Sequence, residues 1–358
     1  MRGFLFLVVL LFYYAQLVLF SGWEQPLGNS VHVLTWRSGE KRIRDPIRTA
    51  APLIPARRNG TTVSSHRNGK RKPYLLEEAS KCLVNKEKQK ILNYDKTGII
   101  YSVVFAVTAD SASGAIVQEL DNTLFMLSVY AREFSCKTVV FTTTPSIIAL
   151  SKTLGHTVVT NTRVNRYGLP FIEDIMEVTH CIYSSRHVGY VNSDILFTSN
   201  LFAIIDSIPK SRPPVFSIYE LALTVKNVEI SPIQHFSNAS EIDNCIRAKA
   251  AGKKRRHVDS ADLFVFSNSS SFTHLRNIVV GRVLFDNCMM RNTYLQGGEL
   301  IDLNAVVEGV HQGHEGFKEH MKQSKATWSN ISWNQNVTRF KYINHQGSLH
   351  YPNRIAID

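Results

Sequence analysis

Apolar residues follow two alternating patterns along the chain from Gly98 onward. Strands are predicted where nearly every position is apolar, at residues 99–107, 138–141, 157–159 and 188–191. Amphipathic helices are predicted where apolar residues recur every three or four positions or where a short segment ends in glycine, at residues 116–131, 146–154 and 171–182. Strands that alternate with helices predict an α/β fold of Rossmann type, with a mixed, mostly parallel sheet and helices on both faces.

The pattern is less regular in the second half of the chain. Four further strands and one helix are predicted there, at residues 216–218, 262–266, 299–303, 306–310 and, for the helix, 283–290. Residues 239–258 contain the basic run Lys253-Lys-Arg-Arg256, and we expect them to form an exposed insertion. Residues 318–358 have no clear pattern and are expected to pack on the domain or to extend it.

The amino-terminal segment is a run of apolar residues from Phe4 to Phe20 that follows Arg2 and is broken only by Gln16. The run is long for the core of a signal peptide and slightly short for a membrane span. Residues 1–20 are therefore expected to form a signal anchor or a cleaved signal peptide. The first would place a single-pass type II protein in the Golgi or ER membrane, and the second would give a secreted protein.

Residues 21–95 carry much of the net charge of +12, with 15 Lys and Arg against 7 Asp and Glu, a local excess of 8. We expect this segment to be a basic, flexible stem that precedes a catalytic domain at residues 96–317. Its few aromatic residues are not regularly interleaved with its charges, and it follows an export signal, so nucleic acid is not the expected partner. Anionic lipid or acidic glycans fit the stem better.

The cysteines and glycosylation sequons are consistent with a secretory chain. Five cysteines without a Cys-x-x-Cys spacing disfavour a structural zinc site, leave room for one or two disulfides and leave at least one thiol over. Asn-x-Ser/Thr sequons, which in a secretory chain mark surface loops, occur at Asn59, Asn238, Asn268, Asn330 and Asn336.

The tripeptide Asn192-Ser193-Asp194 interrupts an apolar segment directly after the predicted strand at residues 188–191. Ligands of open α/β sheets bind at the carboxyl ends of the strands. A carboxylate at that place can hold Mg²⁺ or Mn²⁺ against the phosphates of a substrate. The alternative is an ordinary turn, since all three residue types favour turns.

Two later segments carry further candidate groups. Asp286 lies in a largely apolar stretch near Arg282, and burial would raise the pKa of its carboxyl toward the range of a general base. Its alternative is a structural acid that caps a helix or pairs with Arg282. His311 follows an apolar strand and could donate a nitrogen to a metal, or could belong to a surface loop. Metalloprotease, P-loop, dinucleotide-binding and hydrolase-elbow motifs are absent from the sequence.

Taken in order, these segments resemble a GT-A-type nucleotide-sugar glycosyltransferase-like family over roughly Gly98–Phe317. The resemblance lies in three blocks, which are Asn165-Arg-Tyr-Gly-Leu-Pro170 with Tyr190-Val-Asn-Ser-Asp-Ile-Leu196, Gly281-Arg282 with Phe285-Asp286-Asn287, and Leu300-Ile-Asp302 with His311-Gln-x-His314. It implies a GT-A-like fold and a sugar transfer that depends on Mn²⁺ or Mg²⁺.

The resemblance also implies a role for individual residues. Asp194 would be the last residue of an Asp-x-Asp motif and would bind the metal, with His311 completing the coordination. Asn192 would stand in the place of the first Asp, where it cannot balance charge but can still form hydrogen bonds. Asp286 would activate or orient the acceptor. Cofactor or donor contacts are also expected at Ser193, at Arg282, which could meet a phosphate, and at Asp110, where the nucleotide base would lie.

The sequence therefore predicts a glycosyltransferase that moves a sugar from a nucleotide diphosphate-sugar to a hydroxyl of a glycan, protein or lipid in the secretory pathway. Membrane attachment through the amino-terminal segment is part of this prediction. The alternative is a non-catalytic lumenal protein that binds glycans or nucleotides and has kept a degenerate GT-A fold. The donor, the acceptor and the stereochemistry of the transfer stay open.

Overall fold

The structure is a computed structural model that describes residues 35–38, 91–92, 99–110, 114, 116–211, 218–313, 328–339, 347–349, 352 and 354–357. All of these residues belong to one unit of the chain, Leu34–Asp358. The predicted signal segment at residues 1–20 lies outside the described residues. Among the residues that are described, no helix is both long enough and apolar enough to cross a membrane.

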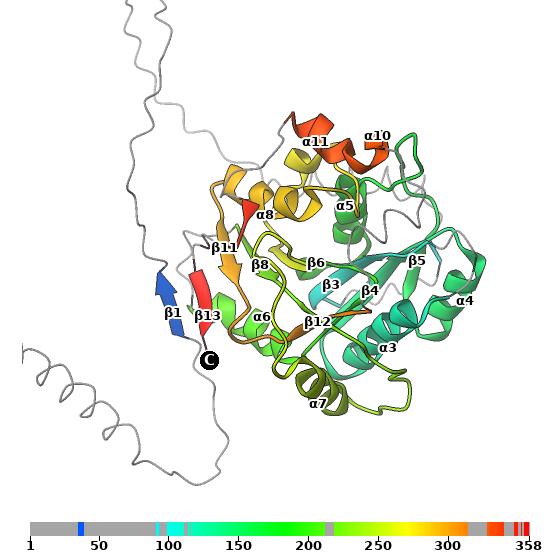
Figure 1. Cartoon of the computed structure of the whole chain (residues 1–358), viewed down its shortest axis with the longest axis vertical. Coiled ribbons are helices and arrows are strands. Elements are labelled where there is room, and N and C mark those ends of the chain that lie inside the picture. Colours follow the sequence, from blue (N-terminus) through cyan, green and yellow to red (C-terminus); the bar gives the residue numbers. More distant parts are fainter. Residues whose placement is uncertain are drawn as a thin grey trace, which may run out of the picture. The chain divides into compact units, whose positions relative to one another are not determined.

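A ten-stranded sheet runs through the described part of the chain, in the order β1-β13-β11-β8-β10-β6-β3-β4-β5-β2. The bounds of its strands are β1 (Thr35–Ser38), β2 (Ile91–Leu92), β3 (Tyr101–Thr108), β4 (Cys136–Phe141), β5 (Thr157–Val159), β6 (Ser185–Val191), β8 (Tyr219–Leu223), β10 (Leu263–Ser267), β11 (Glu299–Asp302) and β13 (Arg354–Ile357). Figure 1 shows β3, β4, β5 and β6 at its centre.

The sheet is mixed, but most of its strands point the same way. β6, β3, β4 and β5 pair in parallel. β10 is antiparallel to both of its neighbours, β6 and β8, so that β8, β11 and β13 again run with the parallel group. The predicted mixed, mostly parallel sheet is therefore confirmed.

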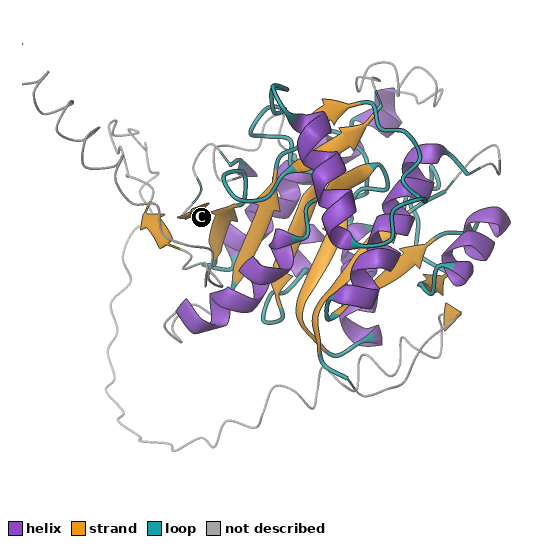
Figure 2. Ribbon diagram, turned by 90° about the horizontal axis from the view of Figure 1, so that it is seen from below, coloured by secondary structure: helices purple, strands orange, loops and turns teal. Residues whose placement is uncertain are grey.

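Helices cover both faces of this sheet, as the sequence predicts. Their bounds are α3 (Gln118–Glu133), α4 (Pro145–Thr153), α5 (Ile172–Ile182), α6 (Asn200–Ser211), α7 (Ala239–Ala250) and α8 (Phe285–Leu295). One apolar core lies under α3, α4, α6 and α7 and the other under α5 and α8. Figure 2 shows the helices on the two sides of the sheet.

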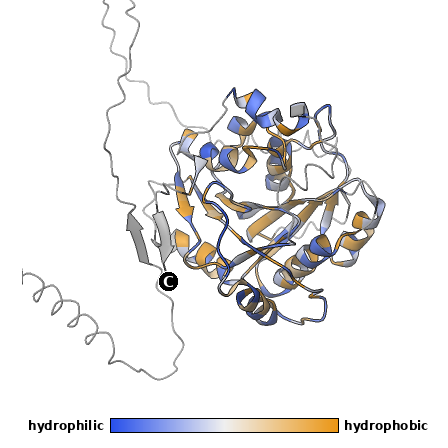
Figure 3. Cartoon of the chain, viewed as in Figure 1, coloured by the Kyte–Doolittle hydropathy of each residue, from blue (hydrophilic) through white to orange (hydrophobic). Residues whose placement is uncertain are grey.

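The alternation of side chains in β3 explains why its sequence is apolar throughout. Val103, Phe105 and Val107 enter the first core, whereas Val104 and Ala106 enter the second. A strand that is buried on both faces needs apolar residues at every position. Figure 3 shows the apolar strands between helices whose outer surfaces are hydrophilic.

A second sheet has three strands, which alternate along the sequence with strands of the first sheet. Its order is β7 (Ile195–Phe197), β12 (Gly309–Gln312) and β9 (Lys226–Val228). β12 is antiparallel to β7 and parallel to β9. This small sheet joins the segment after β6 to segments that follow it in the sequence by 30 to more than 100 residues, and it thereby builds the candidate site.

The predicted exposed insertion at residues 239–258 is wrong for residues 239–250, whereas residues 251–254 are exposed. Ala239, Ile242, Ile246 and Ala250 recur every three or four positions in α7 and are buried in the first core. The helix is anchored at its start, where Asn238 accepts a hydrogen bond from the backbone amide of Glu241. The sequence prediction gave weight to the basic run after α7 and not to the short apolar face, whose spacing is helical.

Two other differences from the sequence prediction concern strands. β8 begins at Tyr219, directly after the end of the segment predicted at residues 216–218. Its charged residue Glu220 is fully buried, and a charged residue inside a strand breaks the apolar run on which the prediction rests. β13 belongs to the carboxyl-terminal segment after residue 317 and pairs with β11, so that this segment adds a strand to the sheet.

Candidate functional site

The turn Asn192–Asp194 connects β6 to β7 at the carboxyl edge of the parallel strands. All three of its residues are half-buried. The turn closes through a hydrogen bond from the backbone amide of Ile195 to the carbonyl of Asn192. It therefore lies where the sequence predicts, at the edge of the sheet where ligands of α/β proteins bind.

His311 meets Asp194 because of the register between β7 and β12. Ile195 is paired with His311, and the backbone amide of Gln312 donates to the carbonyl of Asp194. The Nε2 atom of His311 lies 3.0 Å from Oδ2 of Asp194. The imidazole is almost buried, with 13% of its side chain exposed, while 38% of the Asp194 side chain is exposed. The two groups expected to bind metal are thus in contact.

Asp262, which directly precedes β10, also belongs to this site, although it is not among the site residues predicted from the sequence. Leu263 is paired with Val191, so Asp262 comes to lie beside Asn192. The backbone amide of Asn192 donates to the carbonyl of Asp262 at 3.2 Å, and the side-chain Nδ2 of Asn192 donates to Oδ1 of Asp262 at 3.0 Å. Asp262 is only 4% exposed.

Arg256 connects Asp262 to the small sheet. Its Nε donates to Oδ1 of Asn227 at 2.7 Å, and its Nη1 lies 3.4 Å from Oδ2 of Asp262. Asn227 is paired with His311 across β9 and β12, so Arg256 reaches both sides of the site. Burial raises the pKa of Asp262 to about 6, although the Arg256 guanidinium acts to lower it.

Asp286 lies in the first turn of α8, near the same cluster. The preceding Phe285 packs its ring against that of Tyr190, with centroids 5.4 Å apart, and so fixes the start of the helix against β6. Burial raises the pKa of Asp286 well above its usual range, and the neighbouring Asp262 carboxylate adds to the shift. The structure therefore brings Asp286 within electrostatic range of Asp262, which is hydrogen-bonded to Asn192 of the turn.

Tyr190, in β6, lies near the acids of this cluster. It is fully buried, and its hydroxyl lies 2.9 Å from Oγ1 of Thr108 at the end of β3. Burial raises the pKa of Tyr190, and the carboxylates of Asp194, Asp286 and Asp262 add to this effect. The buried hydroxyl of Tyr190 therefore interacts electrostatically with all three carboxylates.

Asp110 lies at the same edge, just beyond the end of β3. Its Oδ1 accepts hydrogen bonds from the backbone amide of Thr143 at 2.9 Å and from the hydroxyls of Thr142, Thr143 and Thr144 at 3.1, 3.2 and 3.3 Å. These donors fix the exposed carboxylate between the ends of β3 and β4. Its role on the nucleotide side of the site stays a prediction.

Arg282 has other partners than the expected phosphate site. Its Nε donates to Oδ1 of Asn330 at 2.7 Å, and its Nη1 donates to the carbonyl of Gly281. Burial lowers the pKa of Arg282, and among the described residues its side chain donates to Asn330 and Gly281 and to none of the acids of the cluster. The alternative in which Asp286 is a structural acid paired with Arg282 therefore does not hold.

The structure thus gathers Asn192, Asp194, His311 and Asp286 and adds Asp262 and Arg256. Ser193 lies within the turn itself, and the second histidine of the sequence block, His314, lies outside the described residues. An acid at the very start of an apolar strand was the available signal for Asp262. Its meaning depends on the antiparallel pairing of β10 with β6, which the alternating pattern did not predict.

The donor set at the turn fits a divalent cation. Oδ1 of Asp194 and Nδ1 of His311 are buried and have no hydrogen-bond partner among the described residues. Carboxylate oxygen and imidazole nitrogen are ligands that Mn²⁺ accepts, whereas Mg²⁺ prefers oxygen alone. No group of three or more His, Cys, Asp or Glu that could hold a metal occurs in the described part of the chain.

Comparisons with known proteins give structural matches only. Searches of family models and of curated proteins gave no match. A mannosyltransferase from Pyrobaculum calidifontis, solved with GDP-Man and Mn²⁺, matches 76% of this chain over 74% of its own at 15% identity and a TM-score of 0.35. Glucosyl-3-phosphoglycerate synthase from Mycobacterium tuberculosis, solved with Mn²⁺ and UDP, matches 78% of this chain over 88% of its own at 10% identity and a TM-score of 0.34.

Both of these matches are nucleotide-sugar transferases, which is the class that the sequence motifs resemble. At such identities and TM-scores the likeness assigns no function to this chain.

Proposed function

We propose that the chain is a metal-dependent glycosyltransferase that moves a sugar from a nucleotide diphosphate-sugar to a hydroxyl group of a glycan, protein or lipid. The observation that carries the proposal is the contact between Asp194 and His311 at the carboxyl edge of the sheet. Asp286 interacts electrostatically with Asp262, which is hydrogen-bonded to Asn192 of the same turn. A metal-binding pair next to a separate acid is the arrangement that such a transfer needs.

Asp194 and His311 would hold Mn²⁺ through carboxylate oxygen and imidazole nitrogen. When bound, the metal would neutralise negative charge on the leaving diphosphate. The chain supplies two ligands, so the donor diphosphate and water are expected to provide the others. Asp110, fixed by the threonines after β4, would accept a hydrogen bond from the nucleoside part of the donor.

Asp286 would act on the acceptor. A carboxylate whose pKa is raised by burial is a better proton acceptor near neutral pH than an exposed one. Asp286 would orient the acceptor hydroxyl and, in an inverting transfer, would take its proton as the new glycosidic bond forms. The proposal does not depend on whether the transfer inverts or retains configuration.

The proposed location is the lumen of the ER or Golgi, with the amino-terminal segment as signal anchor or signal peptide. Cys181 is disulfide-bonded, and disulfides form and persist mainly in oxidising compartments. Cys136, Cys245 and Cys288 are free thiols. The sequence prediction of one or two disulfides with at least one free thiol agrees with this. The sequons at Asn268 and Asn336 are exposed, as glycosylation requires.

The test is calorimetric titration of the purified full-length chain with UDP, GDP, CDP and their sugar conjugates, with and without Mn²⁺. We expect binding of at least one nucleotide that requires Mn²⁺, followed by slow metal-dependent hydrolysis of its sugar conjugate. Asp194→Asn should remove the Mn²⁺ dependence and weaken binding by about a hundredfold, because the amide cannot balance the charge of the cation.

Asp206→Asn is the matched control. Asp206 lies in α6 and accepts from Arg186 and from the hydroxyl of Ser102, near the amino end of β3 and away from the site. Equal Mn²⁺ dependence in wild type and Asp194→Asn would remove Asp194 from the site. Metal-dependent nucleotide binding without any hydrolysis or transfer would favour the non-catalytic binding protein, and no nucleotide binding at all would overturn the proposal.

A further inference from the structure

Relative to an Asp-x-Asp motif, the turn Asn192–Asp194 lacks one carboxylate. Where the resemblance expects the first carboxylate of an Asp-x-Asp pair, the chain has Asn192. A neutral amide removes one negative charge from a place that faces a divalent cation and a diphosphate. The structure shows a buried carboxylate in direct contact with that amide, contributed by Asp262 from another strand.

The hydrogen bond between the two side chains fixes the orientation of the amide. An ionised carboxylate can only accept hydrogen bonds, so the Nδ2 group of Asn192 has to face Asp262. The carbonyl oxygen Oδ1 of Asn192 is then the atom that the side chain presents away from Asp262. An amide oxygen is a hard ligand and a hydrogen-bond acceptor, and it can do what one oxygen of an aspartate would do at the same place.

A role in strand pairing alone does not explain the Asp262 side chain. The backbones of Asn192 and Asp262 are already joined by a hydrogen bond of 3.2 Å. Burying a carboxylate near two others is costly, and a neutral side chain would hold the strands together without that cost. Arg256 offsets part of the charge, at 3.4 Å from Asp262, but it is shared with Asn227.

We propose that Asp262 is a positioning residue that supplies the second carboxylate of the donor site and holds the Asn192 amide with its oxygen toward the donor and its metal. Asn192 and Asp262 together would then replace the missing aspartate. The inference rests on the proposed function, because it assigns the oxygen of Asn192 to the same nucleotide and metal.

A reciprocal exchange of the two side chains tests this proposal. We compare wild type, Asp262→Asn, Asn192→Asp and the double variant Asn192→Asp/Asp262→Asn for the affinity of UDP and GDP in the presence of Mn²⁺. The readout is a dissociation constant, not catalytic activity. The full-length chain is used throughout, and its thermal unfolding midpoint is recorded for each protein.

Each single variant is expected to bind the nucleotide about tenfold to a hundredfold more weakly. Asp262→Asn no longer fixes the orientation of the neighbouring amide. Asn192→Asp places two carboxylates in contact, so that they repel each other or share a proton. The double variant restores a carboxylate and an amide in exchanged places, and we expect its affinity to return to within about threefold of wild type.

Asp206→Asn again serves as the control and should bind as wild type does. Wild-type affinity in Asp262→Asn, or a double variant as weak as the two single effects combined, would overturn the positioning role while leaving the proposed function intact. A wild-type chain without Mn²⁺-dependent nucleotide binding would instead overturn the proposed function, and the donor role of the pair with it. Unfolding midpoints separate either result from a variant that does not fold.

Discussion

At the scale of single residues, Asp286 has the features of a group that exchanges a proton. It lies in the first turn of α8, and burial raises the pKa of its carboxyl, with Asp262 adding to the shift. Raised carboxyl pKa values of this kind gather at functional sites. Asp194 instead contacts His311, and 38% of its side chain is exposed.

Replacing Asp286 by Asn should therefore separate catalysis from binding. We expect turnover to fall about a hundredfold to ten-thousandfold, because the amide cannot accept the acceptor's proton. The dissociation constant of the nucleotide with Mn²⁺ should change little. Steady-state kinetics and calorimetry on the same preparation measure the two quantities.

The pH dependence of wild-type turnover offers a second measurement on Asp286. Because only the ionised carboxylate accepts a proton, turnover should fall as the pH drops through the raised pKa of Asp286. Asp286→Asn should lose this acidic limb. A variant that keeps both the limb and the turnover of wild type would exclude Asp286 as the proton acceptor.

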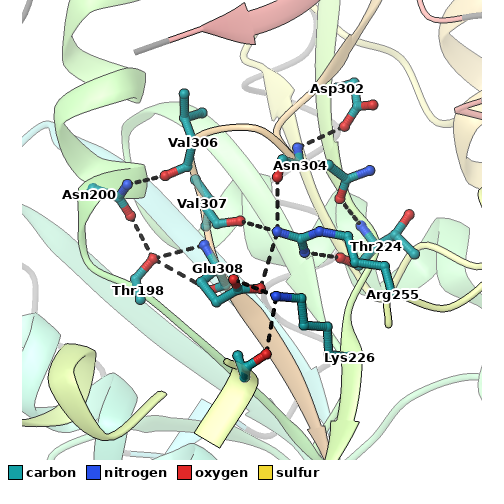
Figure 4. A network of polar contacts seen from close by, with 11 residues as sticks. Thr198, Asn200, Thr224, Lys226, Arg255, Asp302, Asn304, Val306, Val307 and Glu308 are labelled. Atoms are coloured by element: carbon teal, nitrogen blue, oxygen red, sulfur yellow. Dashed lines mark hydrogen bonds and ion pairs between the residues drawn. The ribbon is translucent and has the colours of Figure 1, made fainter. Parts of the chain in front are cut away.

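At the scale of elements, a polar network holds the small sheet that carries His311. Figure 4 shows Glu308 between Lys226 and Arg255, with Nζ of Lys226 at 2.9 Å and Nη2 of Arg255 at 3.1 Å from its carboxylate. Arg255 also donates to the backbone carbonyls of Thr224, Asn304 and Val307. The network joins the segment after α7 to the connections β8–β9 and β11–β12.

Arg255→Met should test this network, because methionine keeps much of the side-chain volume but donates no hydrogen bond. We expect the free energy of unfolding to fall by about 2 to 3 kcal/mol, since Glu308 and three carbonyls lose a partner in a half-buried place. Chemical denaturation measures the change. Affinity for Mn²⁺ and nucleotide should also fall, because β12 follows Glu308 directly and holds His311 in place.

Lys254→Met is the matched control, since Lys254 precedes Arg255 and is exposed. It should change the free energy of unfolding by less than about 0.5 kcal/mol. Equal effects of the two variants would mean that the network of Figure 4 does not stabilise the sheet.

At the scale of the whole molecule, two buried histidines couple stability to pH. His156 is 2% exposed and His187 is 1% exposed, and burial lowers the pKa of each to about 4. Nε2 of His156 lies 2.9 Å from the carbonyl of Leu124, and Nδ1 of His187 lies 2.9 Å from the carbonyl of Ser102. Both histidines are therefore neutral in the folded protein at neutral pH.

The sign of the pH dependence follows from these lowered pKa values. The unfolded chain binds protons at its histidines below about pH 6.5, whereas the folded protein does so only near pH 4. The stability that each neutral histidine contributes is complete above pH 6.5 and is lost as the pH falls toward 4. The loss at pH 4.5 is roughly 2 to 3 kcal/mol for each histidine.

Variants isolate this effect from that of buried acids. Asp262 and Glu220, whose pKa values are raised by burial, act in the opposite sense, because their burial favours the folded state more at low pH. We expect the stability of wild type relative to His156→Gln to decline between pH 7.5 and 4.5, and the same for His187→Gln. Urea denaturation at both pH values measures the difference, and a difference independent of pH would contradict the prediction.

The sequence by itself determined the α/β class, the strands β3, β4, β5 and β6, the helices between them, and the position of Asp194 at the edge of the sheet. These features depend on the spacing of apolar residues within one segment, which is local information. The apolar residues Ala239, Ile242, Ile246 and Ala250 of α7 also have helical spacing in the sequence. The basic residues that follow them instead favoured an exposed segment.

Only the tertiary structure decided which residues meet Asn192 and Asp194. The antiparallel pairing of β10 with β6 brings Asp262 to Asn192, and the pairing of β12 with β7 brings His311 to Asp194. The partners are 70 and 117 residues apart in the sequence. Register between such distant strands is set by packing of both faces of the sheet, so no local pattern specifies it, and the carboxylate missing at Asn192 could be found only in the fold.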